Sequence, residues 1–180
     1  MIYSLPTSLT VGGTEREINS DWRYALDCIE ALQDNELTEA DKVVIMLGLI
    51  YKDPVALDDT QEAVEQAVWF LSGGESDDGK KNLKLMDWEQ DFLYIITPIN
   101  RIAGREIRSA EYLHWWTFLG FYAEVGDCTF AQIVRIRNMK LRGKKLDKAD
   151  QEWYRENRDI VDIKTRYTAE EEEIMKMLGI

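Results

Sequence analysis

Residues 109–142 read SAEYLHWWTFLGFYAEVGDCTFAQIVRIRNMKLR, which includes the longest run of large apolar residues in the chain. At the period of an α-helix, the first half of this stretch is apolar on nearly every side, which is typical of a buried helix. Ser109 is predicted to cap this helix and Gly126 to end it. Thr129 then caps a second helix, and the short connection predicts an antiparallel helical hairpin. We expect the rest of the chain to pack around this hairpin.

Length and composition indicate one globular domain. The chain has 180 residues, of which 45% are hydrophobic and 31% are charged, and this is enough for a hydrophobic core. No apolar run approaches the roughly 20 residues that span a bilayer, and the N-terminus lacks the features of a signal peptide. Cys28 and Cys128 lie in no metal-ligand pattern. Free thiols in a cytosolic protein fit best, with a single disulfide as the alternative.

The net charge of −12 is unevenly distributed along the chain. Residues 1–90 contain 19 acids and 7 bases, whereas residues 91–180 contain 15 of each. Residues 135–148 alone carry seven bases and one acid. An acidic protein is a poor general binder of nucleic acid, because phosphate contacts need a positive surface. The basic run nevertheless allows a local site for anions.

The remaining elements are predicted to be mainly helical. Leu9 and Val11 alternate with polar residues before Gly12 and Gly13, which predicts a small β-hairpin within residues 1–20. Apolar residues at helical spacing predict helices over residues 21–35, 38–51, 59–71 and 87–104, a short helix after Asp147, and a C-terminal helix at 168–180. Residues 72–82 are predicted to be a mobile loop. The predicted fold class is a mainly α, compact single domain over residues 1–180.

Two details of this prediction depend on how the helices pack. Pro98 lies inside the 87–104 helix and is expected to bend or break its last turns, because proline lacks the backbone donor that a helix interior needs. The 38–51 helix carries five apolar residues that we expect to be buried: Val43, Val44, Leu47, Leu49 and Ile50.

The sequence contains no recognisable constellation for catalysis, for a metal or for a cofactor. His114 is the only histidine and sits in an apolar stretch, so a structural histidine with satisfied ring nitrogens is the favoured interpretation. A nucleophilic pair of Cys128 with His114 lacks an evident third group. The glutamates at 170–173 are explained by the positive end of a helix dipole. We therefore expect a protein that is not an enzyme.

The basic run supplies the candidate partner-binding residues. Its simplest interpretation is a solvated helix end and connector, and the next is a patch that docks on an acidic surface, including that of a second copy. Binding of nucleic acid is a third, because exposed aromatic side chains beside bases can stack on nucleobases. The candidate residues are Arg135, Arg137, Lys140, Arg142, Lys144, Lys145, Trp153 and Tyr154.

Four segments of the second half carry a resemblance to one protein family. They are DFLYI at 91–95, NRIAG at 100–104, LHWWTF at 113–118 and QIVRIR at 132–137. Together they resemble a family of tail assembly chaperones. The members of this family are encoded by prophages and phages of Gram-positive bacteria, the phages being ones with long non-contractile tails, and the chaperone genes lie near the tape-measure gene. The motif residues of this resemblance are Asp91, Tyr94, His114, Trp115, Trp116 and Phe118.

The resemblance implies a non-catalytic role in phage tail morphogenesis. The partner would be the tape-measure or tail-tube protein, whose apolar helices need covering until the tail assembles, and the site of action would be the host bacterial cytoplasm. An amphipathic helix held in an apolar groove is a contact suited to this task. Self-association is a further alternative for the partner surface. Other functions left open are a nucleic-acid-associated or regulatory phage protein that uses the basic run, an acidic mimic of DNA, and an enzyme.

Overall fold

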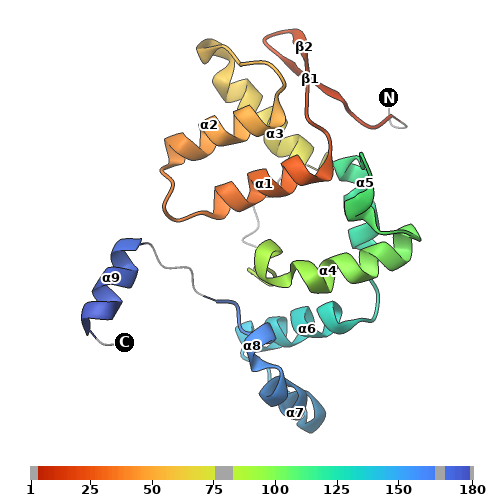
Figure 1. Cartoon of the computed structure of the whole chain (residues 1–180), viewed down its shortest axis with the longest axis vertical. Coiled ribbons are helices and arrows are strands. Elements are labelled where there is room, and N and C mark those ends of the chain that lie inside the picture. Colours follow the sequence, from red (N-terminus) through yellow and green to blue (C-terminus); the bar gives the residue numbers. More distant parts are fainter. Residues whose placement is uncertain (1–3, 76–82, 165–168, 179–180) are drawn as a thin grey trace. The chain divides into compact units, whose positions relative to one another are not determined.

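The structure, a computed structural model, describes residues 4–75, 83–164 and 169–178. It is mainly α-helical with a small N-terminal β-hairpin, so the predicted fold class is confirmed (Figure 1). Contacts within the chain divide it into two compact units. Of the described residues, 4–75, 112–117 and 169–178 belong to unit 1, and 83–111 and 118–164 belong to unit 2. The prediction of a single domain stays a prediction.

Unit 1 begins with the predicted hairpin. Strand β1 (Ser8–Val11) pairs antiparallel with β2 (Thr14–Glu17), and Gly12 and Gly13 form the turn with φ of 59° and 70°. These positive φ values are ones that glycine adopts without steric cost. Leu9 and Val11 are buried, and strand β1 lies against helix α3. The hairpin is thus anchored by one apolar face, as its alternating pattern predicted.

Three helices follow in unit 1: α1 (Trp22–Gln33), α2 (Glu39–Ile50) and α3 (Thr60–Leu71), with the short 3₁₀ helix η1 (Leu57–Asp59) before α3. Helices α1 and α2 lie side by side (Figure 1). Asp21 caps α1 by accepting from the amide of Arg23. Thr38 and Asp41 form a capping box at the start of α2. Each cap satisfies amides that the helix itself leaves without partners.

The predicted burial of α2 is only partly correct. Ile50 is fully buried, but Val44 is 71% exposed, and Val43, Leu47 and Leu49 are half-buried. The buried face of α2 is instead formed by Met46 and Ile50. Although α2 is apolar on most sides, only the face that packs against its neighbours α1 and α3 is buried. The remaining apolar side chains of α2 therefore lie at the surface.

The predicted start of the central hairpin is wrong. Ser109 does not cap a helix; it ends the 3₁₀ helix η2 (Ile107–Ser109), and its hydroxyl donates to the carbonyl of Glu106 over 2.8 Å. Helix α5 begins only at Trp115 and ends at Ala123. Residues 110–114 are not helical. Within them, the backbone of Leu113 bonds to the start of α1: the Trp22 amide donates to the Leu113 carbonyl over 3.0 Å, and the Leu113 amide donates to Asp21.

Unit 2 contains helices α4 (Trp88–Ala103), α6 (Thr129–Leu141), α7 (Lys148–Glu156) and α8 (Arg158–Val161). Helix α6 packs against α4 and α8, with Ile133, Ile136 and Val161 in the core. Pro98 does not break α4, which continues to Ala103 and ends at Gly104 with φ of 66°. The cap of α6 is Cys128 rather than Thr129.

The chain ends of the described structure agree with the sequence pattern where they can be compared. Helix α9 (Ala169–Leu178) corresponds to the predicted C-terminal helix, of which residues 168, 179 and 180 lie outside the described residues. Residues 76–82 of the predicted mobile loop also lie outside them.

Cys28 and Cys128 are free, and burial raises the pKa of Cys28 to about 12. Within the described ranges, no helix is both long and apolar enough to cross a membrane.

Candidate partner-binding site

Helix α6 divides the basic run into buried and exposed cations. Arg137 is 4% exposed and forms an ion pair with Asp91 of α4, with Nη2 at 2.9 Å from Oδ1. The same guanidinium donates to the carbonyls of Leu85, Ile160 and Val161. Every side of this cation is thus used inside unit 2. Arg137, predicted to bind a partner, instead ties α4, α6 and α8 together, and Asp91 of the family motif is its counter-ion.

Arg135, one half-turn away, lies at the surface and is paired with Asp150 of α7. Its side chain is 51% exposed, and Nη1 lies 2.7 Å from Asp150 Oδ2. The hydrogen bonds from Arg135 hold the pKa of Asp150 below its usual value. Since Asp150 also has its backbone amide bonded to Asp147, the pair fixes the start of α7 against α6.

Lys140 forms the centre of a second polar cluster. Its Nζ lies 2.5 Å from Asp162 Oδ1 and 2.5 Å from the Tyr154 hydroxyl, and 3.9 Å from the centre of the tyrosine ring. Burial opposes the charged form of Lys140, but the bonds to Asp162 and Tyr154 outweigh it and raise the pKa of the lysine. Arg158 adds a further contact to Asp162 over 3.0 Å. The charges of Lys140 and Asp162 are therefore paired with each other inside unit 2.

Trp153 and Tyr154 are half-buried and pack on the core of Ile133, Ile136 and Val161. Stacking on a nucleobase needs an exposed ring face. The two rings mainly close the core of unit 2, so the basic run lacks the exposed aromatic side chains that its interpretation as a nucleic-acid site requires.

The exposed part of the predicted site is the C-terminal end of α6 and the following connection. Arg142, Lys144 and Lys145 are exposed there. Arg142 donates to the side chain of Asn138 over 2.7 Å, and among the described residues no carboxylate pairs with Lys144 or Lys145. Of the eight predicted residues, these three are the cations still available to an outside partner.

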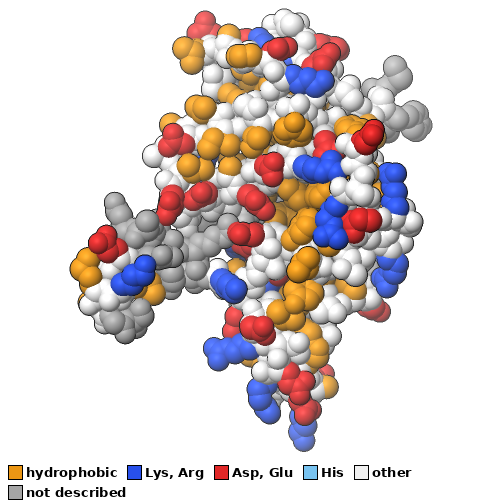
Figure 2. Space-filling model, viewed as in Figure 1, with side chains coloured by type: hydrophobic (Ala, Val, Ile, Leu, Met, Phe, Trp, Pro, Cys, Tyr) orange, Lys and Arg blue, Asp and Glu red, His pale blue; other side chains and the backbone are white. Residues whose placement is uncertain are grey.

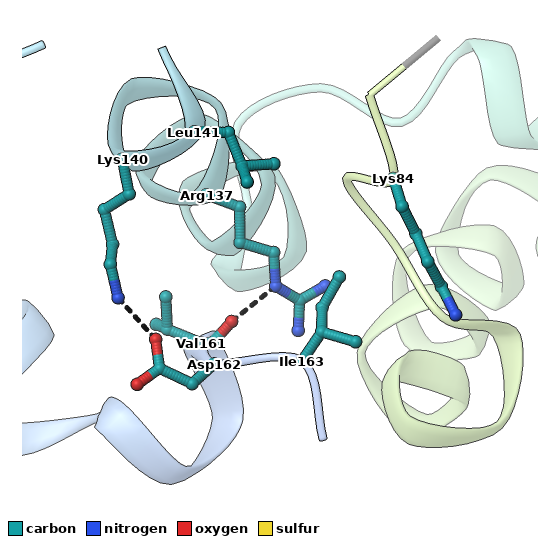
Figure 3. Close-up of a pocket in the computed structure, with 7 residues that line it drawn as sticks. All are labelled: Lys84, Arg137, Lys140, Leu141, Val161, Asp162 and Ile163. Atoms are coloured by element: carbon teal, nitrogen blue, oxygen red, sulfur yellow. Dashed lines mark hydrogen bonds and ion pairs between the residues drawn. The ribbon is translucent and has the colours of Figure 1, made fainter. Parts of the chain in front are cut away.

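A pocket of about 280 Å³ lies beside this surface and is drawn in Figure 3. Leu141, Val161 and Ile163 give it an apolar wall, and Lys84, Arg137, Lys140 and Asp162 give it polar edges. Figure 3 shows Lys140 bonded to Asp162 and Arg137 bonded to the Val161 carbonyl. Lys140 and Asp162 bond to each other, Lys84 bonds to Asp87 over 3.1 Å, and Arg137 bonds to Asp91. The pocket can accept a single apolar side chain, and nothing in it aims a free charge at a ligand.

The histidine and tryptophans of the family motif belong to unit 1, where they join three segments. His114 Nε2 donates to the carbonyl of Pro6 over 2.9 Å, and Nδ1 accepts from the amide of Trp116 over 3.0 Å. Because the Pro6 carbonyl can only accept, these bonds select the neutral Nε2–H tautomer. Burial lowers the pKa of His114, which also favours the neutral ring.

The two tryptophans of the motif bind the end of α3. Trp115 Nε1 donates to the Leu71 carbonyl over 2.9 Å, and Trp116 Nε1 donates to the Phe70 carbonyl over 2.8 Å. The Trp116 ring also meets Trp69, with ring centres 5.2 Å apart. The last carbonyls of a helix have no partner within it. Trp115 supplies a donor to the Leu71 carbonyl, and Trp116 adds a second donor to the Phe70 carbonyl, which also accepts from the Gly73 amide over 3.1 Å. We call residues 112–117 the clasp, because they fix the N-terminal segment, α1 and α3 to one another.

The remaining motif residues, Tyr94 and Phe118, belong to unit 2. Tyr94 packs on the core of α6 and α8, and the fully buried Phe118 meets Trp88 with ring centres 6.0 Å apart. The motif residues thus have structural roles in both units. Within the described residues, no group of three or more histidine, cysteine, aspartate or glutamate side chains is placed to hold a metal ion.

The structure also shows an apolar surface that the sequence analysis missed. A groove of about 430 Å³ lies between α2 and the connection that follows it, and Val43, Val44, Leu47 and Leu57 contribute to its lining. Leu57 is 91% exposed. In Figure 2, hydrophobic side chains form a row over the region where Figure 1 places α2, with acidic side chains beside it. The signal in the sequence was the number of apolar residues in α2, which exceeds what one buried face can take.

Comparison with known proteins gives one result. The family model described as bacteriophage Gp15 protein matches residues 1–163, which includes all the motif segments quoted above. No curated protein and no solved structure matches the chain.

Proposed function

The chain belongs to the bacteriophage Gp15 protein family, and from this membership we propose that it is a non-catalytic tail morphogenesis protein that chaperones the tape-measure or tail-tube protein. The resemblance of its motif segments to tail assembly chaperones of phages of Gram-positive bacteria supports the finer assignment. The site of action is then the cytoplasm of the infected host, where the tail components are made.

The observation that carries the proposal is the apolar surface of an acidic unit. Residues 4–75 contain 15 acidic and 4 basic side chains, yet Val44 and Leu57 are exposed beside a groove. Apolar side chains that gather at a groove mark a contact surface more often than scattered ones do. The negative charge keeps a complex with an aggregation-prone partner in solution.

The experiment that tests the proposal is co-expression of the tagged protein with the tape-measure protein of the same phage. We expect the tape-measure protein to become soluble and to co-purify with the tag. The tail-tube protein is tested in the same way, and an unrelated acidic helical protein with the same tag is the control. If both phage proteins stay insoluble or fail to co-purify while this protein is folded, the proposal is wrong.

The exposed lysines favour a second candidate function, that of a phage protein associated with nucleic acid. Lys144 and Lys145 are exposed and have no acidic partner among the described residues. If this function held, Lys144→Glu with Lys145→Glu would weaken DNA binding, and affinity would fall steeply with salt. Absence of DNA binding by the unaltered protein near physiological salt would exclude it.

A further inference from the structure

We propose that the groove of unit 1 binds a basic amphipathic helix of the partner, with the apolar stripe of that helix on α2 and its lysines or arginines against the acidic rim. The inference rests on the proposed function for the identity of the partner. It adds where the partner binds and what chemistry the bound segment has.

The first step is the shape of the surface. The groove is lined by residues at helical spacing along α2 and its end, namely Val43, Val44, Leu47 and Tyr51, and by Leu57 of the following connection. Residues spaced three and four apart share one face of a helix. These residues form an apolar strip along about two turns of α2, and the apolar face of another helix can pack on such a strip.

The second step is exposure. Val44 is 71% and Leu57 is 91% exposed, although both are large apolar side chains on ordered elements of unit 1. A lone exposed leucine is ordinary, but here the exposed side chains line a groove of about 430 Å³. A volume of this size lies within the range of specific binding pockets.

The third step is the charge around the groove. Residues 39–62 contain six acids and two bases. Both bases are already paired: Lys42 lies 3.0 Å from Glu39, and Lys52 lies 2.9 Å from Glu17. Lys52 and Asp53 both line the groove, and Asp58 follows Leu57 directly; both aspartates are exposed. Arg16, which bonds to the Pro54 carbonyl over 3.2 Å, is paired with Asp59, so the acids still outnumber the bases here. The rim therefore attracts cations and repels anions.

This charge selects among possible occupants. Helix α9 of the chain itself, or of a second copy, has an apolar stripe of Ile174, Met177 and Leu178, but residues 170–173 are four consecutive glutamates. Like charges placed together at an interface oppose binding. A helix with the same apolar stripe and basic flanks has the complementary charge, and a long helical phage protein held before assembly can supply it.

The direct test uses the full-length protein and two labelled model peptides, read by fluorescence anisotropy. Both peptides carry leucine at positions i, i+3, i+4 and i+7; the first carries lysine at the remaining positions and the second carries glutamate. We expect the leucine–lysine peptide to bind and the leucine–glutamate peptide not to bind. Equal binding of the two peptides would overturn the charge assignment.

The variant that tests the groove is Val44→Ala combined with Leu57→Ser. Both side chains are exposed, so the fold is retained, and far-ultraviolet circular dichroism verifies this. We expect the affinity for the leucine–lysine peptide to fall by about tenfold or more, because burial of two apolar side chains is lost. The matched control is Leu93→Ser, which removes a leucine that is 66% exposed on α4 and should change the affinity by less than about twofold.

Failure of this inference can be told from failure of the proposed function. If the unaltered protein co-purifies with the tape-measure or tail-tube protein and the double variant does so equally well, the groove is not the contact and the inference is overturned, while the proposed function stands. If the unaltered protein co-purifies with neither but binds the basic peptide through Val44 and Leu57, the inference stands and the proposed function fails. Loss of self-association in the double variant, without loss of peptide binding, would identify a second copy as the occupant and overturn the inference.

Discussion

At the scale of single residues, His114 links the pH dependence of stability to the clasp. Its Nδ1 accepts a hydrogen bond from the Trp116 amide, so protonation at Nδ1 removes an acceptor. Burial lowers the pKa of the folded ring from the ordinary value of 6.5. Between the two pKa values the unfolded chain binds more protons than the folded one, and stability therefore falls as the pH falls below about 6.5.

The corresponding experiment compares urea unfolding of the protein and of His114→Asn at pH 7.5 and 5.5. Asparagine can still cap α5 but does not titrate, so we expect the variant to lose less stability on acidification. The difference can reach about 1.4 kcal/mol for each pH unit inside the window. Equal losses in both proteins would show that His114 titrates alike in the folded and unfolded states.

The second residue-scale prediction concerns the buried pair of Asp91 and Arg137. Asp91→Ala leaves a cation without its partner inside unit 2, and we expect a loss of about 3–5 kcal/mol in the free energy of unfolding. Lys140→Ala is the matched control, because Lys140 lies on the same helix as Arg137 but pairs with Asp162, which is 38% exposed and keeps Arg158 as a second partner. Its loss should stay below about 1 kcal/mol.

The double variant Asp91→Leu with Arg137→Met shows whether stability depends on the ion pair itself or only on the absence of an unpaired buried charge. Replacing both charges by apolar side chains removes the uncompensated cation, so we expect the double variant to be more stable than Asp91→Ala alone. Urea unfolding followed by tryptophan fluorescence measures all of these variants. A double variant no more stable than Asp91→Ala would contradict the assignment of the cost to an unpaired charge.

At the scale of elements, four helix caps were predictable, whereas the predicted caps Ser109 and Thr129 were wrong and helix packing was not predictable. Asp21, Thr38, Asp87 and Asp147 all cap the helices that the sequence placed after them, because a cap depends on its own chain within three residues. The start of α5 was missed because the bonds that hold the backbone of Leu113 outside the helix come from Asp21 and Trp22, about 90 residues earlier.

The candidate site shows the same limit within a single helix. Arg135 and Arg137 have the same chemistry and are two positions apart, yet one is exposed and the other is buried against Asp91. Only the packing of α4 against α6 separates them. The groove was missed for a related reason: an apolar residue of α2 can be counted from sequence, but which of its faces meets α1 and α3 is set by tertiary contacts.

Helix α9 gives an element-scale prediction about stability. Its apolar residues Ile174, Met177 and Leu178 are exposed, so they bury little surface on folding. Deletion of residues 169–180 should therefore change the free energy of unfolding by less than about 1 kcal/mol. Urea unfolding of the shortened and full-length proteins measures this, and a larger loss would mean that α9 docks on the folded chain in solution.

At the scale of the whole molecule, unit 1 depends on six residues that are distant in sequence. Within residues 112–117, His114 bonds to Pro6, Trp115 to Leu71 and Trp116 to Phe70. In the sequence, residues 83–111 of unit 2 separate this segment from residues 4–75 of unit 1. A fragment that ends at residue 75 loses these donors and the ring contact of Trp116 with Trp69, although the Phe70 carbonyl keeps the amide of Gly73. The clasp is thus a condition for a complete unit 1, which gives the motif residues His114, Trp115 and Trp116 a structural role.

This dependence can be tested with three fragments of unit 1. Residues 1–75 joined by a Gly/Ser linker to residues 112–117 should unfold cooperatively in urea, because every bond of the clasp can form. Residues 1–75 alone should unfold at lower urea or without a cooperative transition. The same linked fragment with His114, Trp115 and Trp116 replaced by alanine should behave as residues 1–75 do, since the linker by itself adds no donor. If the three fragments unfold alike, the clasp contributes nothing to the stability of unit 1, and the motif would then be retained for contact with a partner rather than for folding.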